Sequence, residues 1–386
     1  MTKIKILFKM FYLYHKAAFD PLIKVFSDDP AYEVSLSLTH EINRFFGTFI
    51  RQESSKYIQK FKADGYRISD ESEQFDIVVV PDTVEESRYG KTLLCFVNHG
   101  TGIKNVLYRN LRKHQPNRYM IFVEGQYRVD KLIESGCIFN CEVYKVGLPK
   151  LDPYFKKGFF NREDILNSFG LNPEKKTVLF APTYKPTCVY EVKNAIFEAT
   201  RNYNLIIKLH HYAWMGKYAR HSQHRIFERR LKKNPHAVVI PKNYYNILPL
   251  IAVADTLVSE ASSTVFDFLA TGKTGVIYDL PHEQMKHTDG EYILSTDNRE
   301  FLKDAFVHIN HPDQLEVGIT QALNPVEENI ETAKKDRDYF FYKLDGKASE
   351  RVVNDLIFRL RNDGFRMHKP EDYHIKIDRS YREDGI

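Results

Sequence analysis

Short, unbroken apolar runs, each followed by a stretch of helical length, constrain this chain more than any other feature. The runs that begin at Asp76 (DIVVV) and Leu93 (LLCFV) are too short for helices and lack the polar alternation of a half-exposed strand. Such runs are typical of strands buried on both faces, as in parallel sheets covered by helices. The repeated order of strand and helix therefore predicts an α/β fold.

The expected strands form two consecutive series. The first series is expected over residues 4–14, 32–38, 75–81, 92–98, 119–124 and 142–146. The second series is expected over residues 177–182, 205–209, 237–240, 256–259 and 275–278. Helical stretches are expected at residues 15–26, around residues 42–61, and over the charged residues 327–361. Two such series predict two Rossmann-like lobes with parallel sheets that face a central cleft.

The domain organisation follows from this order. We expect an N-terminal Rossmann-like lobe over residues 1–160, a C-terminal Rossmann-like lobe over 161–345, and a C-terminal helix with a polar tail over 346–386. The length of 386 residues suits two domains of ordinary size. Ligands of such folds bind in the crevice at the carboxyl ends of the strands, so the residues that follow strands are the informative ones.

Composition narrows the classes of partner. The chain has 56 basic and 51 acidic residues and a net charge of +5. This charge suits a substrate that carries phosphates or a contact with an anionic membrane face, although ordinary solubility explains it equally well. The excess is too small to indicate binding to nucleic acid. The four cysteines complete no zinc site, and nothing requires disulfides, which fits a reducing cytoplasm.

The N-terminal residues 1–14 are basic and apolar and resemble the start of a signal sequence. They lack a small-residue cleavage site, and Lys9 interrupts their apolar stretch. We interpret them as the first strand of a sheet, with a membrane-surface segment as the alternative. No run of the sequence approaches the apolar length that spans a bilayer.

His99 follows an expected buried strand directly, and Gly100, Thr101 and Gly102 come next. The glycines allow a sharp turn and a close approach of the backbone to a ligand. A histidine at such a place can act as a general base, because its pKa lies near working pH. The alternative is a loop histidine that only hydrogen-bonds its neighbours.

Two further strand ends carry polar residues. Pro182 cannot continue a central strand, so the Thr183 hydroxyl after it is expected to be exposed and to meet a phosphate or a nucleotide. A plain strand end is the alternative. Another strand carries Lys208 and delivers His210 and His211 to the rim of the cleft, where an imidazole can donate a hydrogen bond to a phosphate oxygen. Adjacent histidines in a strand point to opposite faces, so a shared metal ion is not expected.

The stretch from residue 254 to residue 281 carries the strongest signal, because it has the order strand, small-residue loop, helix, glycine turn and strand. Ser262 and Ser263 stand where the helix is expected to begin. Hydroxyls, free N–H groups and the positive helix end together form an anion site there, with simple helix capping as the alternative. Asp267 is expected either to stay solvated or to face the cleft and bind a hydroxyl. The sequence contains no P-loop and no Asp-x-Asp after a strand, so no metal site is expected.

These stretches together resemble the CDP-glycerol glycerophosphotransferase family, the polyol-phosphate transferases of teichoic-acid and capsule synthesis. The resemblance covers roughly residues 75–357. It rests on six pieces in the family's order: His99-Gly100-Thr101, Gly147-Leu148-Pro149-Lys150-Leu151-Asp152, Ala181-Pro182-Thr183, Lys208-Leu209-His210, Ser262-Ser263 with Phe266-Asp267, and Asp345-Gly346-Lys347-Ala348-Ser349-Glu350-Arg351. No single piece is decisive, but six pieces in one order are hard to obtain by chance.

The resemblance implies a GT-B fold with an N-terminal acceptor lobe and a C-terminal nucleotide-donor lobe. It implies transfer of glycerol phosphate, or a related polyol phosphate, from a CDP-linked donor to a hydroxyl of a cell-envelope glycan or lipid-linked glycan, with CMP leaving. It implies no obligatory metal or other cofactor. It also implies a cytoplasmic location with peripheral contact to the anionic inner face of the cell membrane.

The resemblance also assigns roles to residues. His99 would be the catalytic base, and His210 would act in catalysis by contacting the donor's phosphates. Ser262, Ser263 and Thr183 would bind the donor. The residues that would support the cleft are Gly100, Thr101, Pro182, Lys208 and Asp267.

Two departures from the family's pattern leave the donor open. His211 stands where the family commonly has proline, and Glu260-Ala261 stands where Asp-Tyr is frequent. CDP-glycerol, CDP-ribitol and a nucleotide sugar therefore all remain candidate donors. One alternative function is that of a GT-B glycosyltransferase, or of an epimerase resembling UDP-N-acetylglucosamine 2-epimerase. Another is that of a non-catalytic binding or assembly protein, which would tolerate the loss of His99.

Overall fold

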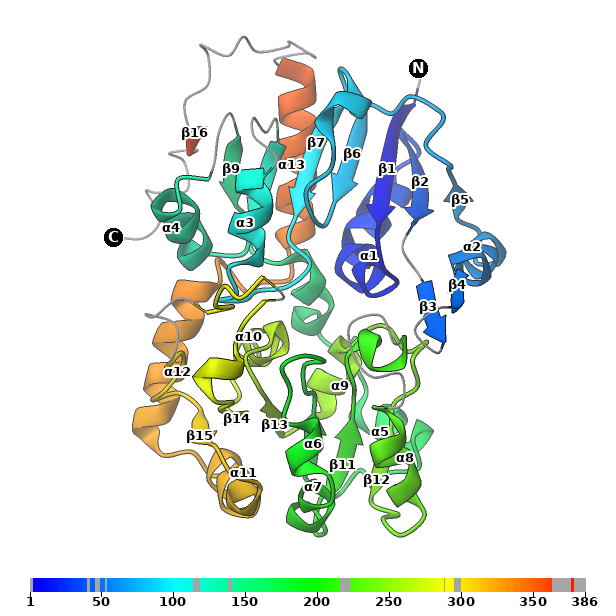
Figure 1. The fold of residues 1–386 in the computed structure, drawn as a ribbon. Coiled ribbons are helices and arrows are strands. Elements are labelled where there is room, and N and C mark those ends of the chain that lie inside the picture. The colour runs from blue at the N-terminus through cyan, green and yellow to red at the C-terminus, as the bar shows by residue number, and fades with distance from the viewer. Residues whose placement is uncertain are drawn as a thin grey trace.

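The computed structural model describes residues 3–39, 42–45, 49–52, 54–113, 119–137, 141–215, 223–287, 289–294, 300–362 and 376–377. These residues form two lobes, each built on a parallel sheet with helices around it. Figure 1 shows the N-terminal lobe in blue and cyan above the C-terminal lobe in green and yellow. The expected α/β class with two parallel sheets is confirmed.

The N-terminal sheet has the strand order β16-β9-β8-β7-β6-β1-β2-β5, and all its pairings are parallel. Its strands are β1 (Ile4–Met10), β2 (Tyr32–Leu38), β5 (Arg67–Ile68), β6 (Ile77–Val80), β7 (Leu93–Val97), β8 (Tyr119–Val123), β9 (Glu142–Lys145) and β16 (Lys376–Ile377). Its helices are α1 (Tyr14–Ser27), α2 (Ser54–Ala63), α3 (Val106–Lys113) and α4 (Gln126–Glu134), with the 3₁₀ turns η1 (Glu86–Tyr89) and η2 (Pro149–Phe155). The apolar runs that predicted buried strands are β6 and β7, which lie side by side.

The C-terminal sheet has the strand order β12-β11-β10-β13-β14-β15, again with parallel pairings only. Its strands are β10 (Thr177–Phe180), β11 (Asn204–Ile207), β12 (Ala237–Val239), β13 (Thr256–Ser259), β14 (Val276–Tyr278) and β15 (Val307–Ile309). The helices around it are α5 (Arg162–Ser168), α6 (Val189–Val192), α7 (Ala195–Ala199), α8 (Arg225–Leu231), α9 (Leu248–Val253), α10 (Ser263–Leu269) and α11 (Leu315–Leu323), with the 3₁₀ turns η3 (His211–Trp214), η4 (His282–Gln284) and η6 (Pro312–Gln314). The strands after which we expected site residues are therefore present.

The expected helix around residues 42–61 is wrong over its first half. β3 (Ile42–Phe45) and β4 (Phe49–Gln52) pair as an antiparallel hairpin, and only α2 is helical in this stretch. The hairpin sequences INRF and FIRQ are rich in β-branched and aromatic residues, which favour strands.

The first strand also ends earlier than expected, at Met10 rather than at residue 14. The Nδ1 atom of His15 accepts hydrogen bonds from the backbone N–H groups of Phe11 (3.2 Å) and Tyr12 (3.3 Å), which turn the chain into α1. β1 lies inside the sheet between β2 and β6, and Ile6, Leu7 and Phe8 are fully buried. The membrane-surface alternative for this segment is therefore wrong.

The charged stretch 327–361 is two helices rather than one. α12 (Glu327–Phe340) lies along the C-terminal lobe, and α13 (Ala348–Asn362) returns to the N-terminal lobe, as the orange segments of Figure 1 show. Gly346 in the connection has a φ of +74°, a conformation that favours glycine and ends helical geometry. Val352 and Leu356 of α13 are buried in the same core as Phe19 of α1. The last described helix thus packs with the first lobe.

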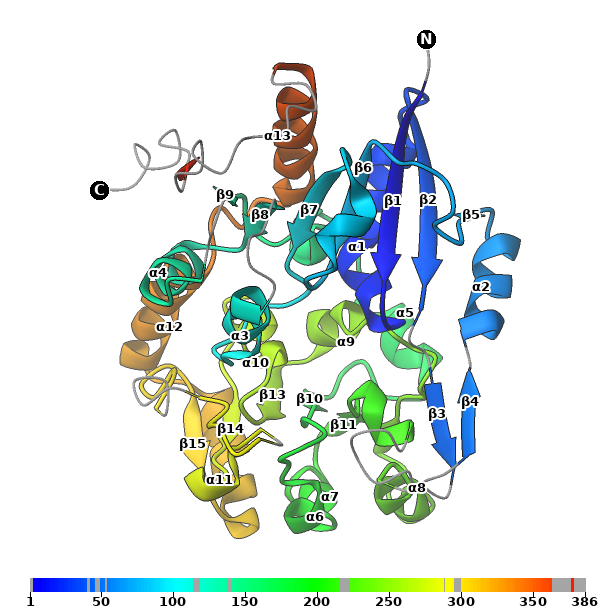
Figure 2. The same ribbon diagram turned by 45° about the horizontal axis from the view of Figure 1, so that its top comes forward.

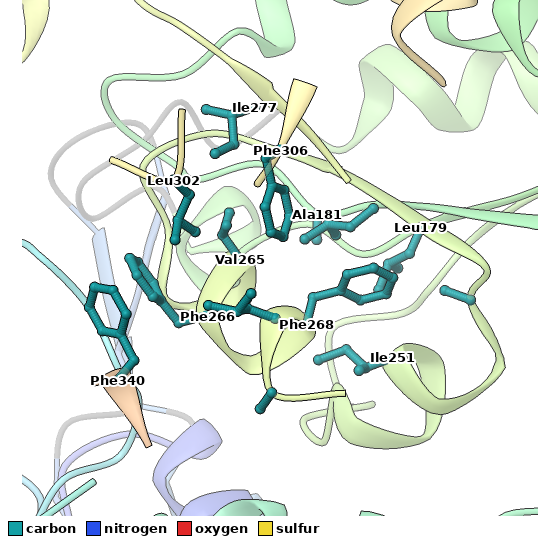
Figure 3. Packing of buried hydrophobic residues seen from close by; sticks show 14 of the residues in the cluster. Leu179, Ala181, Ile251, Val265, Phe266, Phe268, Ile277, Leu302, Phe306 and Phe340 are labelled. Carbon is teal, nitrogen blue, oxygen red and sulfur yellow. The ribbon is translucent and has the colours of Figure 1, made fainter. Parts of the chain in front are cut away.

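The core of the C-terminal lobe fixes the position of α10. Figure 3 shows Val265, Phe266 and Phe268 of α10 among apolar side chains from the sheet and the neighbouring helices. All three are fully buried, and each such side chain contributes roughly 1.5–3 kcal/mol by leaving water. Both views place α10 on the side of the C-terminal lobe that faces the N-terminal lobe (Figure 1, Figure 2).

The helices that the structure describes include none with both the length and the apolar character needed to cross a bilayer. The four cysteines are buried and form no disulfides.

Candidate active site between the lobes

A cavity of about 470 Å³ lies between the two lobes. Loops after β1, β6 and β7 form one wall, and loops after β10, β11 and β13 form the other. The carboxyl ends of parallel strands thus meet at the cavity, as ligand sites of this architecture require. Predicted site residues that line the cavity are His99, Gly100, Thr101, Thr183, His210, Ser262 and Ser263, whereas Pro182, Lys208 and Asp267 are not among its lining residues.

His99 lies directly beyond β7 and is half-buried. Its Nδ1 atom is 3.1 Å from the carbonyl oxygen of Pro81. A carbonyl oxygen only accepts hydrogen bonds, so Nδ1 carries the proton and Nε2 carries a lone pair. Burial lowers the pKa of His99 below its ordinary value, and the nearby carboxylates of Asp82 and Asp267 oppose that shift. The ring is therefore neutral at working pH and can accept a proton at Nε2.

His210 has the opposite tautomer. Its Nδ1 atom accepts a hydrogen bond from the backbone N–H of Tyr212 at 3.2 Å, so Nε2 carries the proton. Burial lowers the pKa of His210 well below its ordinary value, and positive neighbours such as Lys104 and Lys208 lower it further. A neutral ring that donates from Nε2 suits a phosphate oxygen.

α10 begins at the cavity, as the serine pair predicted. Ser262 is the N-cap residue, and its hydroxyl accepts a hydrogen bond from the backbone N–H of Thr264 at 3.3 Å. Ser263 is exposed at the first position of the helix. The two hydroxyls line the same cavity as His210 and can donate hydrogen bonds into it.

Gly100 joins the two walls. A Cβ atom at this position would lie 3.1 Å from Cβ and 3.2 Å from Oγ of Ser263. The loop that carries the candidate base therefore packs directly on the first turn of α10. Thr101, next in the chain, is fully buried, and its hydroxyl has no hydrogen-bond partner among the described residues.

The expectation of an exposed Thr183 hydroxyl is wrong. Glu260, 1% exposed, accepts hydrogen bonds from the Thr183 hydroxyl (2.6 Å) and the Thr183 backbone N–H (2.8 Å) on one carboxylate oxygen. Its other carboxylate oxygen accepts from the Thr187 hydroxyl (3.0 Å) and from the backbone N–H of Cys188. A carboxylate from the adjacent strand end thus holds the loop after β10, a long-range contact that the local sequence does not reveal.

Asp267 is neither solvated nor directed at the cavity. It is fully buried and forms an ion pair with Lys150 of η2. Burial raises the pKa of Asp267, and the Lys150 ammonium opposes this rise. Lys208 is half-buried; its Nζ donates to the carbonyl of Leu209 at 3.3 Å, and burial lowers its pKa to about 8. Neither residue is among those that line the cavity.

The β1–α1 loop and the start of α1 contribute residues that the sequence analysis missed, because it assigned residues 11–14 to a strand and His15 to a helix. Tyr12, Tyr14 and His15 line the cavity, together with Lys104 from the loop before α3. The run FYLYH directly after the carboxyl end of the first strand was the available signal. The structure describes no group of three or more His, Cys, Asp and Glu side chains arranged to hold a metal ion.

Comparison with known families gives one match over more than half of the chain. Residues 136–358 match the family described as CDP-glycerol:poly(glycerophosphate) glycerophosphotransferase. The teichoic acid poly(ribitol-phosphate) polymerase of Bacillus spizizenii is 24% identical over 263 residues, which is 64% of this chain and 36% of that protein. The chain thus spans about a third of that relative.

Solved structures confirm the fold class. The wall teichoic acid polymerase TagF superposes with a TM-score of 0.61 at 14% identity, covering 93% of this chain and 90% of that chain. The UDP-GlcNAc 2-epimerase of Neisseria meningitidis, solved with UDP-GlcNAc, superposes with a TM-score of 0.58 at 12% identity, covering 92% and 100%. The shared arrangement is the GT-B fold. At these identities the likeness shows the fold alone.

Proposed function

This chain belongs to the CDP-glycerol:poly(glycerophosphate) glycerophosphotransferase family, and from that premise we propose that it transfers a polyol phosphate. The donor is CDP-glycerol or a related CDP-linked polyol, the acceptor is a hydroxyl of a teichoic-acid, capsule or similar glycan, and CMP leaves. The observation that carries the proposal is the pair of oppositely protonated histidines on one cavity: His99 can accept a proton at Nε2, and His210 can donate from Nε2.

In the proposed reaction the acceptor hydroxyl gives its proton to Nε2 of His99. Its oxygen bonds to the β-phosphorus of the donor, and the bond from that phosphorus to the bridging oxygen breaks, so that CMP leaves with the bridging oxygen. His210, the Ser262 and Ser263 hydroxyls and the Lys104 ammonium bind the donor's phosphate oxygens. The protein's contribution is then mainly positioning and stabilisation of charge.

The two lobes divide the substrates in this proposal. Residues 1–160 hold the acceptor, a glycan or lipid-linked glycan, and residues 161–345 hold the donor, whose phosphates Lys104 of the first lobe also contacts. The support is that the base follows β7 of the first sheet, whereas His210 and the serines follow β11 and β13 of the second.

We further propose a cytoplasmic location with peripheral contact to the anionic inner face of the membrane. The supporting surface is the turn between η2 and α5, where Phe159 is 57% exposed and follows the exposed Lys156 and Lys157. Aromatic and basic side chains together suit an anionic interface. Phe159→Ser is expected to reduce co-sedimentation with phosphatidylglycerol vesicles, whereas the matched change Val317→Ser on α11 is not; equal binding by both variants would contradict this surface.

The proposed donor is tested by binding before turnover. The purified protein is heated with CDP-glycerol, CDP-ribitol, UDP-sugars and CMP, because a ligand that binds the folded state raises the melting temperature. We expect stabilisation by the CDP-polyols and loss of most of it in His210→Ala. Stabilisation by UDP-sugars alone would contradict the CDP-linked donor.

A further inference from the structure

We propose that the β1–α1 loop, residues 11–13, and Tyr14, the first residue of α1, form the acceptor-binding wall of the cavity and that Tyr14 holds the acceptor's hydroxyl-bearing end against His99. The inference rests on the proposed function and goes further by naming the surface that selects the acceptor. This loop is not part of the six stretches that resemble the family, and it carries neither His99 nor His210.

Tyr14 lies beside both histidines. Its ring centroid is 6.0 Å from that of His99 and 5.9 Å from that of His210. It also lines the cavity, as do both histidines. A group that contacts Tyr14 in the cavity is therefore close to both the proposed base and the proposed phosphate-binding histidine.

His15 holds this loop in shape and is a positioning residue. It is 2% exposed, and its Nδ1 atom accepts from the backbone N–H groups of Phe11 and Tyr12. Its ring centroid is 4.7 Å from that of His99 and 4.5 Å from that of Tyr14. The loop and the base thus form one packed unit rather than two independent loops.

The loop also reaches the second lobe. The rings of Tyr12 and Tyr14 stack at 5.5 Å with an interplanar angle of 8°, and Tyr12 meets Tyr212 edge-on at 5.3 Å. The Tyr212 hydroxyl is hydrogen-bonded within this group to Tyr12 and Tyr14. The aromatic wall is therefore continuous across the cleft, from the base to the loop after β11.

The chemistry of this wall suits the acceptor rather than the donor. Residues 11–14 have the sequence FYLY and carry no permanently charged side chain. The groups suited to phosphate, which are His210, Ser262, Ser263 and Lys104, come from other loops. Aromatic faces bind C–H groups, and phenol groups exchange hydrogen bonds with hydroxyls. A neutral, hydroxylated chain end fits these residues, whereas a pyrophosphate does not.

The test separates acceptor affinity from donor affinity. The probes are CDP-glycerol and a short synthetic glycerol-phosphate oligomer with a fluorescent tag at the end remote from the growing hydroxyl. Wild type, Tyr14→Ala and Tyr14→Phe are compared, with Tyr339→Ala on α12, 41% exposed, as the matched control. We expect Tyr14→Ala to raise the KM for the oligomer by at least about tenfold, equal to 1.4 kcal/mol. Tyr14→Phe should raise it less, and the control should not raise it.

The donor's Kd is measured by calorimetry without acceptor and is expected to stay within about twofold of wild type in both Tyr14 variants. A tenfold weaker Kd for the donor with an unchanged KM for the oligomer would overturn the inference. If Tyr14→Ala lowers the melting temperature, the KM for the oligomer in Tyr14→Phe is used instead, because this variant keeps the aromatic ring. If wild type releases no CMP from CDP-glycerol or from CDP-ribitol, the proposed function fails. The acceptor-binding role of Tyr14 can then still be tested with whichever donor raises the melting temperature, by comparing the KM for the acceptor between variant and wild type.

Discussion

His99 and His210 are the same residue type, and the atom that each Nδ1 contacts determines what each ring can do. The Pro81 carbonyl fixes the proton on Nδ1 of His99, and the Tyr212 amide fixes it on Nε2 of His210. Both contacts are made by backbone atoms, so they persist when neighbouring side chains are changed. The loop backbones thus make His99 a proton acceptor and His210 a hydrogen-bond donor to phosphate oxygens.

Removal of the base is the first prediction at this scale. His99→Ala should lower turnover by about 10²–10⁴-fold, because loss of a general base typically costs that much. Donor-induced thermal stabilisation should be kept, since the donor's phosphates bind other residues. His311→Ala, whose exposed imidazole side chain lies at η6, is the control. Full activity of His99→Ala on a defined acceptor would show that the base is another group.

The pH profile gives a second prediction. A base must be neutral to act, and burial lowers the pKa of His99 below its ordinary value of 6.5. The acid limb of kcat/KM should therefore lie below pH 6.5, with the rate lost as pH falls through the folded-state pKa. The measurement is kcat/KM across pH in wild type, with melting temperature recorded at each pH. An acid limb clearly above pH 6.5 would contradict the assignment of His99 as a base that is neutral at working pH.

At the scale of elements, the loops at the strand ends determine the site. Gly100 brings the loop after β7 against α10, and the carboxylate of Glu260, directly after β13, holds the loop after β10. Each contact joins segments that are far apart in the chain. The strands position the loops, and the contacts between the loops position the side chains of the site.

Gly100→Ala tests the first of these contacts. The added Cβ would meet Ser263 at 3.1–3.2 Å, so the base loop or the first turn of α10 must shift by a few tenths of an ångström. We expect kcat to fall about tenfold, since small displacements of reacting groups are costly. Gly102→Ala is the matched control, because its Cβ would meet no atom within 4 Å. Equal effects of the two changes would contradict the argument.

Glu260→Gln tests the second contact. Both carboxylate oxygens accept hydrogen bonds from N–H or O–H groups, so an amide nitrogen must face donors whichever way it turns. The variant should lose about 1–3 kcal/mol of stability, the cost of leaving buried partners unsatisfied. Chemical denaturation measures the loss. A variant as stable as wild type would show that the loop does not depend on this carboxylate.

Sequence patterns predicted several strands and the start of α10, but they missed the buried contacts of two site residues and the β1–α1 loop. The expected strands 32–38 and 256–259 have the bounds of β2 and β13. The serine pair predicted the start of α10, because capping is also local. The burial of Thr183 and Asp267 was missed, since it depends on Glu260 and Lys150, which lie far away in the chain. The β1–α1 loop was missed because the His15 contacts end the strand early.

At the scale of the whole molecule, packed helices and a buried ion pair connect the two lobes. η2 packs against α1 of the first lobe and α9 of the second, and Lys150 of η2 pairs with Asp267 of α10. α13 returns from the second lobe to the core of the first. The two sides of the site are therefore held together by buried contacts.

The buried pair should matter for stability. Asp267→Asn leaves the Lys150 ammonium buried without its counter-charge, and breaking such a pair costs about 3–5 kcal/mol. The control is Asp28→Asn in the exposed Lys24–Asp28 pair of α1, where a loss below about 1 kcal/mol is expected. Chemical denaturation of both variants measures the two losses in the free energy of unfolding. Equal small losses would mean that the buried pair contributes no more than a surface pair.

The most direct test of the central claim is the identity of the products. The purified protein is incubated with CDP-glycerol and the tagged glycerol-phosphate oligomer, and both products are followed by mass spectrometry. We expect CMP and an oligomer extended by whole glycerol-phosphate units, with neither formed by His99→Ala. Release of UDP from a UDP-sugar, with no CMP and no extension from any CDP-polyol, would contradict the central claim.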